Sequence, residues 1–313
     1  MQTSGSEFFV SGVYAALATP RRPNSIESDG AALLDYLDAV VRAGVDGIVL
    51  FGSTGEFIHF DVNERMRTIT LAIKRSQVPV LVNVSHSTLS GAIALGEHAA
   101  SSGAAGVLLM PPYFYRYSGE QIAAFYSAFT SALGGATPVF LYNLPDFTNP
   151  IAAELAENLL AREDFAGIKD SSGDWELFER LRELRGQRRF SLLVGAESLF
   201  LRARQAGADG IVSGLAAAFP ELIVALDRAL AASDMDRARR LDERLRELVG
   251  WVNRFPATAA IKQAAITREW PLQHFALPFD KDTAADLIAF QQWFRVWLPA
   301  VLSEIDEPAA IIG

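Results

Sequence analysis

The stretch Gly44-Val45-Asp46-Gly47-Ile48 decides the fold, because its pattern recurs twice further along the chain. The same arrangement of two glycines and a β-branched residue returns as Gly103-Ala104-Ala105-Gly106-Val107 and Gly207-Ala208-Asp209-Gly210-Ile211. A glycine in the first position suits the left-handed conformation that ends a helix. The apolar residues after the second glycine suit a strand. We interpret the pattern as a structural repeat at helix-to-strand junctions and not as a nucleotide-binding motif.

Eight short β-rich runs recur at intervals of about 20 to 35 residues, roughly the length of a βα unit. They lie at 13–18, 47–51, 78–84, 106–110, 138–142, 165–169, 190–194 and 210–213. Most are near-continuous Val, Ile and Leu runs, as expected of parallel strands that are buried on both faces. Eight such units predict an α/β fold of the TIM (β/α)8 barrel type.

Helices are predicted between these strands and after the last one. Asp61 with Glu64, and Ser118 with Gln121, have the spacing of capping boxes that begin helices. Beyond the eighth strand, helical segments follow one another at 235–249, 258–267 and 283–302. We predict a barrel over residues 8–219, C-terminal helices packed on it over 220–305, and flexible termini at 1–7 and 306–313.

The composition excludes several classes of function. The chain has no cysteine, which rules out disulfides, thiolate metal sites and a cysteine nucleophile. A net charge of −9, without a basic run interleaved with aromatic residues, argues against a nucleic-acid partner. Apolar stretches end well before the roughly 20 residues of a membrane span, and residues 1–7 lack the pattern of a signal peptide. We expect a cytoplasmic protein with no membrane partner.

Lysine is rare in this chain. Only four of its 28 basic residues are lysines: Lys74, Lys169, Lys262 and Lys281. Lys169 ends the apolar run Asp164-Phe165-Ala166-Gly167-Ile168, where a plain structural lysine would extend its charge toward water. Lysine can lose its proton when desolvated, whereas arginine effectively cannot. A neutral amine can attack a ketone and form an imine, so Schiff-base chemistry is our first hypothesis for Lys169.

Polar or small residues stand where the predicted strands end. They are Gly52-Ser53-Thr54-Gly55-Glu56, Tyr142-Asn143, Lys169, Gly195 and Ser213-Gly214. In a barrel these ends meet at the carboxyl face, where active sites lie. Hydroxyl and backbone N–H groups there would hold a small anionic ligand. We interpret Glu56 as structural, because a carboxylate beside the reactive lysine would favour its charged form.

Three motifs occur together in order: Gly52-Ser53-Thr54-Gly55-Glu56, Tyr142-Asn143-Leu144-Pro145 and Gly167-Ile168-Lys169-Asp170-Ser171-Ser172-Gly173. They resemble the motifs of the dihydrodipicolinate synthase / N-acetylneuraminate lyase family. The resemblance runs from Ala18-Thr19-Pro20 to Pro256-Ala257-Thr258-Ala259-Ala260-Ile261-Lys262, nearly the whole chain. Members of this family are pyruvate-handling class I aldolases on a TIM barrel.

The resemblance implies a role for each matching residue. Lys169 would be the Schiff-base lysine, and Tyr142 the general acid/base that shuttles protons. Ser53 and Thr54 would bind the keto-acid carboxylate, and Thr54 would also help to place Tyr142. The backbones of two further residues would line the pocket, namely Gly195 and Val212.

Three departures from the family pattern concern the second substrate and the hydroxyl relay. Phe147 stands where the synthase branch has an arginine that binds the carboxylate of the second substrate. An apolar ring cannot make this contact, so aspartate semialdehyde is disfavoured as the second substrate. Glu197 is the one acid left of the pair that holds sugar hydroxyls in the sialic-acid lyase branch. Phe114 takes the place of a relay tyrosine supplied across a subunit interface. Tyr113, Tyr115 or water would then take the role of that relay tyrosine.

The resulting prediction is a Schiff-base lyase or aldolase that acts on pyruvate, or another 2-keto acid, and an aldehyde. The alternative is a 2-keto-3-deoxy sugar acid aldolase or dehydratase. An alternative from another class of function is a catalytically silent protein that binds a keto acid. The resemblance also implies a homo-oligomer, a tetramer or a dimer. We expect no cofactor and no metal, because the four histidines show no metal-ligand spacing: His59, His86, His98 and His274.

Overall fold

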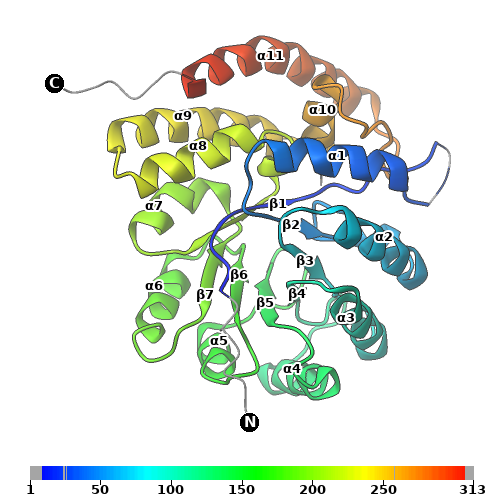
Figure 1. Cartoon of the computed structure of the whole chain (residues 1–313), viewed down its shortest axis with the longest axis vertical. Coiled ribbons are helices and arrows are strands. Elements are labelled where there is room, and N and C mark those ends of the chain that lie inside the picture. Colours follow the sequence, from blue (N-terminus) through cyan, green and yellow to red (C-terminus); the bar gives the residue numbers. More distant parts are fainter. Residues whose placement is uncertain (1–8, 24, 26, 257, 307–313) are drawn as a thin grey trace.

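The chain forms a closed barrel of parallel strands surrounded by helices (Figure 1). The computed structural model describes residues 9–306 except 24, 26 and 257. Within them the strands are β1 (Gly12–Ala16), β2 (Gly47–Leu50), β3 (Val80–Asn83), β4 (Gly106–Leu109), β5 (Val139–Asn143), β6 (Gly167–Asp170), β7 (Ser191–Val194) and β8 (Gly210–Ser213). The barrel closes where β1 pairs with β8, so the predicted TIM barrel is confirmed.

Helices alternate with the strands and then continue past them. The ring consists of α1 (Gly30–Arg42), α2 (Val62–Arg75), α3 (Leu89–Ser102), α4 (Gly119–Leu133), α5 (Ala153–Leu160), α6 (Trp175–Leu184), α7 (Phe200–Gln205) and α8 (Pro220–Ala231). Three short 3-10 helices follow strands: η1 (Phe57–His59), η2 (Glu197–Leu199) and η3 (Leu215–Ala217). The C-terminal helices are α9 (Met235–Val252), α10 (Ala259–Thr267) and α11 (Lys281–Asp306). None of the helices in the described residues is long and apolar enough to cross a membrane.

The repeated glycine pattern serves the junctions predicted for it. The first glycine of each copy has a left-handed backbone, with φ of 89° at Gly44, 90° at Gly103 and 100° at Gly207. The second glycine lies where strands approach closely. A Cβ on Gly47 would come within 2.2 Å of the Tyr14 ring, and one on Gly210 within 2.0 Å of the Gly12 carbonyl oxygen. Glycine is therefore required at both positions, for different reasons.

The two predicted capping boxes have different outcomes. Ser118 and Gln121 form a complete box at the start of α4. At α2 the Asp61 side chain accepts from the Glu64 N–H at 2.8 Å, as expected, but the Glu64 carboxylate does not return the bond. It accepts from the Ser28 N–H at 2.8 Å and from the Ser28 hydroxyl. Glu64 thus ties the segment before α1 to α2.

The boundary between barrel and extension lies later than predicted. The prediction placed α8 among the C-terminal helices, but α8 packs against β1 and α7 and completes the ring. The additional helices begin with α9, which contacts η2, while α10 contacts η3. Figure 1 shows α11 outside α8 and α1. The predicted flexible termini lie outside the described residues, except for Asp306, which ends α11.

We expect Gly207→Ala to lower the free energy of unfolding by about 1–2 kcal/mol, because only the left-handed backbone opposes the new methyl group. No other atom lies within 4 Å of that Cβ position. Gly250→Ala in α9 is the matched control, since its Cβ also meets nothing within 4 Å. There alanine should stabilise the helix by about 0.5–1 kcal/mol. Urea denaturation followed by circular dichroism measures both, and equal shifts in the two variants would contradict this explanation.

Candidate active site

The carboxyl ends of the strands open into a cavity of about 670 Å3. Residues after β2, β4, β5, β6, β7 and β8 line it, and α9 and α10 contribute a further wall. All the residues proposed from the sequence as catalytic or substrate-binding lie in this lining: Ser53, Thr54, Tyr142, Phe147, Lys169, Gly195, Glu197 and Val212. The fold therefore gathers into one place residues that are up to about 160 positions apart in the chain.

Lys169 lies inside the barrel, beside Tyr142. The two residues are partners in the parallel register of β6 and β5, so their side chains point the same way. Only 4% of Lys169 is exposed, and its Nζ lies 4.0 Å from the centre of the Tyr142 ring. Its amine pairs with no carboxylate among the described residues. A buried lysine without a counter-charge is costly to keep, which marks Lys169 as the candidate nucleophile.

The Tyr142 hydroxyl meets the loop after β2. Its oxygen lies 3.3 Å from Ser53 Oγ. From the sequence we expected Thr54 to orient Tyr142. In the structure Ser53, and not Thr54, contacts the Tyr142 hydroxyl. The Thr54 hydroxyl faces Gly214 instead, where an added Cβ would come within 2.9 Å of Oγ1. Thr54 still lines the cavity, so its predicted contact with the keto acid stays a prediction.

The loop after β2 has a strained backbone that its neighbours hold in place. Phe51 and Glu56, which flank it, have left-handed φ values of 56° and 52°. The Asn83 side chain donates to the Phe51 carbonyl at 2.6 Å. The Thr19 hydroxyl donates to the Gly55 carbonyl at 2.8 Å. Such strain persists only where the surroundings over-determine it, and it is common at functional sites.

The same loop leaves donors open to a ligand. Within the described residues, the backbone N–H groups of Ser53 and Thr54 donate to no protein acceptor. Both residues line the cavity and carry hydroxyls as well. Adjacent backbone N–H groups and hydroxyls form a concave anion site. This arrangement suits the small carboxylate expected from the sequence.

Gly195 provides the space that Lys169 occupies. A Cβ on Gly195 would come within 2.8 Å of Lys169 Cε and 2.0 Å of Ser171 Oγ. The Gly195 N–H donates to the Asp170 carbonyl at 2.6 Å, so this donor is not available to a ligand. Val212, in β8, adds an apolar wall and is 1% exposed.

Glu197 lines the cavity with one oxygen already engaged. Its Oε1 accepts from the Ser213 hydroxyl at 2.8 Å and from the Leu215 N–H at 3.1 Å. These bonds join the segments after β7 and β8 and fix the carboxylate in one orientation. Its predicted contact with substrate would use the other oxygen.

Glu56 belongs to a buried ion pair that sequence reasoning did not find. Its Oε2 lies 2.5 Å from the Nζ of Lys262, a residue that is 0% exposed, and 3.6 Å from the Arg21 guanidinium. The Thr258 hydroxyl donates to Oε1 at 3.1 Å. Burial lowers the pKa of Lys262, and Glu56 opposes that shift. The structural interpretation of Glu56 agrees with these contacts, and the rarity of lysine was the only sequence signal for its partner.

The structure distinguishes the two tyrosines that flank Phe114. Tyr113 lines the cavity and packs edge-on against Phe57, with ring centroids 5.9 Å apart. Tyr115 is 66% exposed and packs on Phe114, which is 87% exposed. Within one chain, therefore, Tyr113 is the tyrosine that reaches the site.

Among the histidines, His59 alone lines the cavity in the described residues. Burial and the nearby Arg21 charge lower the pKa of His59, which favours the neutral form of its ring. In the same part of the chain, no three His, Asp or Glu side chains are grouped so that they could hold a metal ion.

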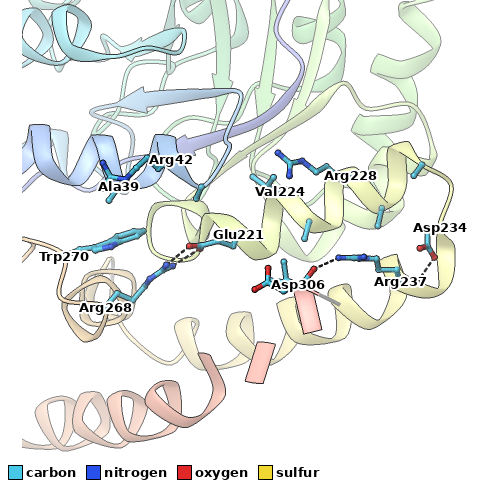
Figure 2. A pocket seen from close by; sticks show the side chains of 15 residues that line it. Ala39, Arg42, Glu221, Val224, Arg228, Asp234, Arg237, Arg268, Trp270 and Asp306 are labelled. Atoms are coloured by element: carbon cyan, nitrogen blue, oxygen red, sulfur yellow. Dashed lines mark hydrogen bonds and ion pairs between the residues drawn. The ribbon is translucent and has the colours of Figure 1, made fainter. Parts of the chain in front are cut away.

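A second hollow, of about 800 Å3, lies outside the barrel between α1, α8, α9 and the end of α11 (Figure 2). Arg268 pairs there with Glu221, and Arg237 donates to the Ile305 carbonyl. None of the strand-end residues lines this hollow, so it is not the catalytic candidate.

A TIM barrel that holds a buried lysine and a tyrosine side by side at its carboxyl face has the groups that an aldolase-type lyase requires. The model of the dihydrodipicolinate synthetase family matches residues 9–288. The chain belongs to this family, and it is a lyase of the class I aldolase type.

Known relatives agree with this assignment. An uncharacterized DapA-like lyase of Chloroflexus aurantiacus is 32% identical over 285 residues, which cover 89% of this chain and 95% of the relative. A probable 2-dehydro-3-deoxy-D-pentonate aldolase of Escherichia coli is 28% identical, over 80% of this chain and 85% of its own. A solved structure of an Escherichia coli prophage protein of the dihydrodipicolinic acid synthase family, in complex with pyruvate, has a TM-score of 0.84 and 25% identity. The match covers 91% of this chain and 98% of the prophage protein.

We expect Glu56→Gln to lower the free energy of unfolding by about 3–5 kcal/mol, because it leaves the Lys262 ammonium and the Arg21 guanidinium buried without a carboxylate. The double variant Glu56→Gln, Lys262→Met also removes the closer of the two buried cations and should recover part of that loss. Urea denaturation measures the two side by side. If the double variant were no more stable than the single one, the ion pair would not be the reason for the loss.

Proposed function

We propose that the protein is a Schiff-base lyase in which Lys169 forms an imine with pyruvate or a similar 2-keto acid. The observation that carries the proposal is the buried Lys169 amine, which lies against Tyr142 in the cavity without a carboxylate partner in the described residues. Family membership supports it. So does the related prophage protein that was solved in complex with pyruvate.

The reaction follows from these groups. The Lys169 amine attacks the keto carbon, and water leaves as the imine forms. The protonated imine withdraws electrons, so the neighbouring carbon releases a proton and becomes an enamine. That carbon forms a bond to the aldehyde carbon, and the aldehyde oxygen takes up a proton. Water then hydrolyses the imine, which releases a 4-hydroxy-2-keto acid and the free lysine, and the reverse sequence cleaves the same bond.

The neighbours of Lys169 bind and orient the reactants in this scheme. Ser53 and Thr54 hold the carboxylate through their free N–H groups and hydroxyls. Tyr142 moves protons to and from the imine and the aldehyde oxygen. The Ser53 hydroxyl, 3.3 Å from the phenol oxygen, orients it. The imine is itself the electron sink, so we propose that the reaction needs no metal and no further cofactor.

A second candidate is the aldol cleavage or dehydration of a 2-keto-3-deoxy sugar acid. It is favoured by the pentonate aldolase relative and by the free oxygen of Glu197, which could accept a hydroxyl. Product analysis separates aldol cleavage from dehydration, because a dehydratase releases no pyruvate. A keto-acid-binding protein would bind pyruvate without turning over any aldehyde.

We further propose that the protein acts in the cytoplasm as a homo-oligomer.

The imine can be trapped. Incubation with pyruvate and borohydride should add a pyruvate-sized mass to the peptide that contains Lys169, because reduction makes the imine permanent. Lys169→Ala should abolish the adduct, and Lys281→Ala, at the start of α11, should retain it. Intact and peptide mass spectrometry reads the result. Failure to trap pyruvate and a series of other 2-keto acids would refute the Schiff-base mechanism.

Tyr142→Phe should lower kcat by about 10²–10⁴-fold, the usual contribution of a positioned general acid/base. The adduct with pyruvate should still form under borohydride, since Lys169 remains. Single-turnover kinetics with the enzyme in excess measure the effect on the chemical step. An unchanged kcat would exclude Tyr142 as the proton carrier.

A further inference from the structure

The part of the cavity beyond the keto-acid groups has no cation with which to bind a second anion. Among the described lining residues there is no arginine, and Lys169, which the imine occupies, is the only lysine. Glu56 is engaged by Lys262, whose side chain is fully buried and cannot reach a ligand. Burial lowers the pKa of His59, which disfavours a positive charge on its ring. A carboxylate or phosphate on the second substrate would therefore meet Glu197 and no counter-charge.

Several polar side chains of this region are already engaged by the protein itself. The Thr148 hydroxyl donates to the carbonyls of Leu144 and Asn149. The Thr258 hydroxyl donates to Glu56. Among the described lining residues outside the keto-acid site, this leaves Ser171, Asn253, the His59 ring and the Tyr113 hydroxyl, beside the one free oxygen of Glu197. Any hydroxyl of a sugar aldehyde that faced the apolar part of the lining would lack a partner, which is costly.

The same region has an extensive apolar wall. Its side chains come from four parts of the fold, namely the loop after β5, η1, α9 and α10: Leu144, Phe147, Phe57, Ile58, Val249, Val252 and Ile261. Two of them stand at the mouth with much of their surface in water, since Phe147 is 69% and Ile58 is 67% exposed. A ligand that covers them removes apolar surface from water, which favours binding.

We propose that the aldehyde partner is uncharged and carries an apolar aryl or branched alkyl group, which packs against Phe147, Ile58 and the α9–α10 wall. The proposal rests on the proposed function, since it concerns the second substrate of the same imine. The enamine of pyruvate adds to this aldehyde and gives a 4-hydroxy-2-keto acid with an apolar end. The reverse reaction releases the aldehyde and pyruvate, so the balance of atoms is unchanged.

The test compares aldehydes that differ in one property. Succinic semialdehyde and 4-methylpentanal have the same shape, with a carboxylate in one replaced by an isopropyl group in the other. Benzaldehyde and D-glyceraldehyde complete the panel, and the 4-hydroxy-2-keto acid product is measured by mass spectrometry with the purified full chain and pyruvate. We expect kcat/KM for 4-methylpentanal and benzaldehyde to be at least about tenfold above that for the other two.

Phe147→Arg should reverse the selection. An arginine at the mouth supplies the missing cation, so the kcat/KM ratio of succinic semialdehyde to 4-methylpentanal should rise by about tenfold or more. Phe147→Leu, the matched control, keeps an apolar side chain and should leave that ratio within about threefold of its original value. Position 147 is exposed, so neither change disturbs the barrel core.

Borohydride trapping of pyruvate on the same preparation separates the two levels of failure. If the adduct forms but the charged or hydroxylated aldehyde is preferred, or no aldehyde of the panel reacts, the apolar partner is refuted and the Schiff base stands. If neither pyruvate nor other 2-keto acids form an adduct, both proposals are refuted.

Discussion

The site depends on the parallel pairing of β5 with β6. The register sets Tyr142 directly opposite Lys169, and a shift by one residue would turn one of the two side chains away from the barrel interior. The amine is then held 4.0 Å from the ring of the residue that we propose to move its protons. Gly195 on the other side leaves the space for the lysine chain. The position and the burial of Lys169 both follow from this pairing and its neighbours.

A second constraint connects the C-terminal helices to the catalytic face. Lys262, in α10, reaches Glu56, which ends the strained loop after β2. The same loop presents Ser53 to Tyr142 and leaves two N–H groups open to a carboxylate. The extension therefore contributes to the site in two ways, because it anchors the loop through an ion pair and provides the apolar wall of the cavity. A bare barrel would lack both.

The two buried lysines show why charge alone does not identify a functional residue. Lys262 is fully buried and has a carboxylate 2.5 Å away, so its role is structural. Lys169 is nearly as buried, but it lines the cavity, where its amine is open to a ligand. The rarity of lysine in this chain drew attention to Lys169, whereas the burial of Lys262 emerged only from the structure. Only the position of Glu56 separates one from the other.

The sequence by itself determined the barrel, because strand runs, helix ends and the repeated glycines are local patterns that follow from backbone geometry. It also supplied the residues of the site, since those that end parallel strands must meet at one face. Only the tertiary structure decided that Ser53 and not Thr54 contacts Tyr142, that Tyr113 and not Tyr115 reaches the cavity, that α8 belongs to the ring, and that Lys262 pairs with Glu56. These outcomes depend on side-chain directions and on contacts across as many as 206 positions of the chain, and no local pattern encodes either.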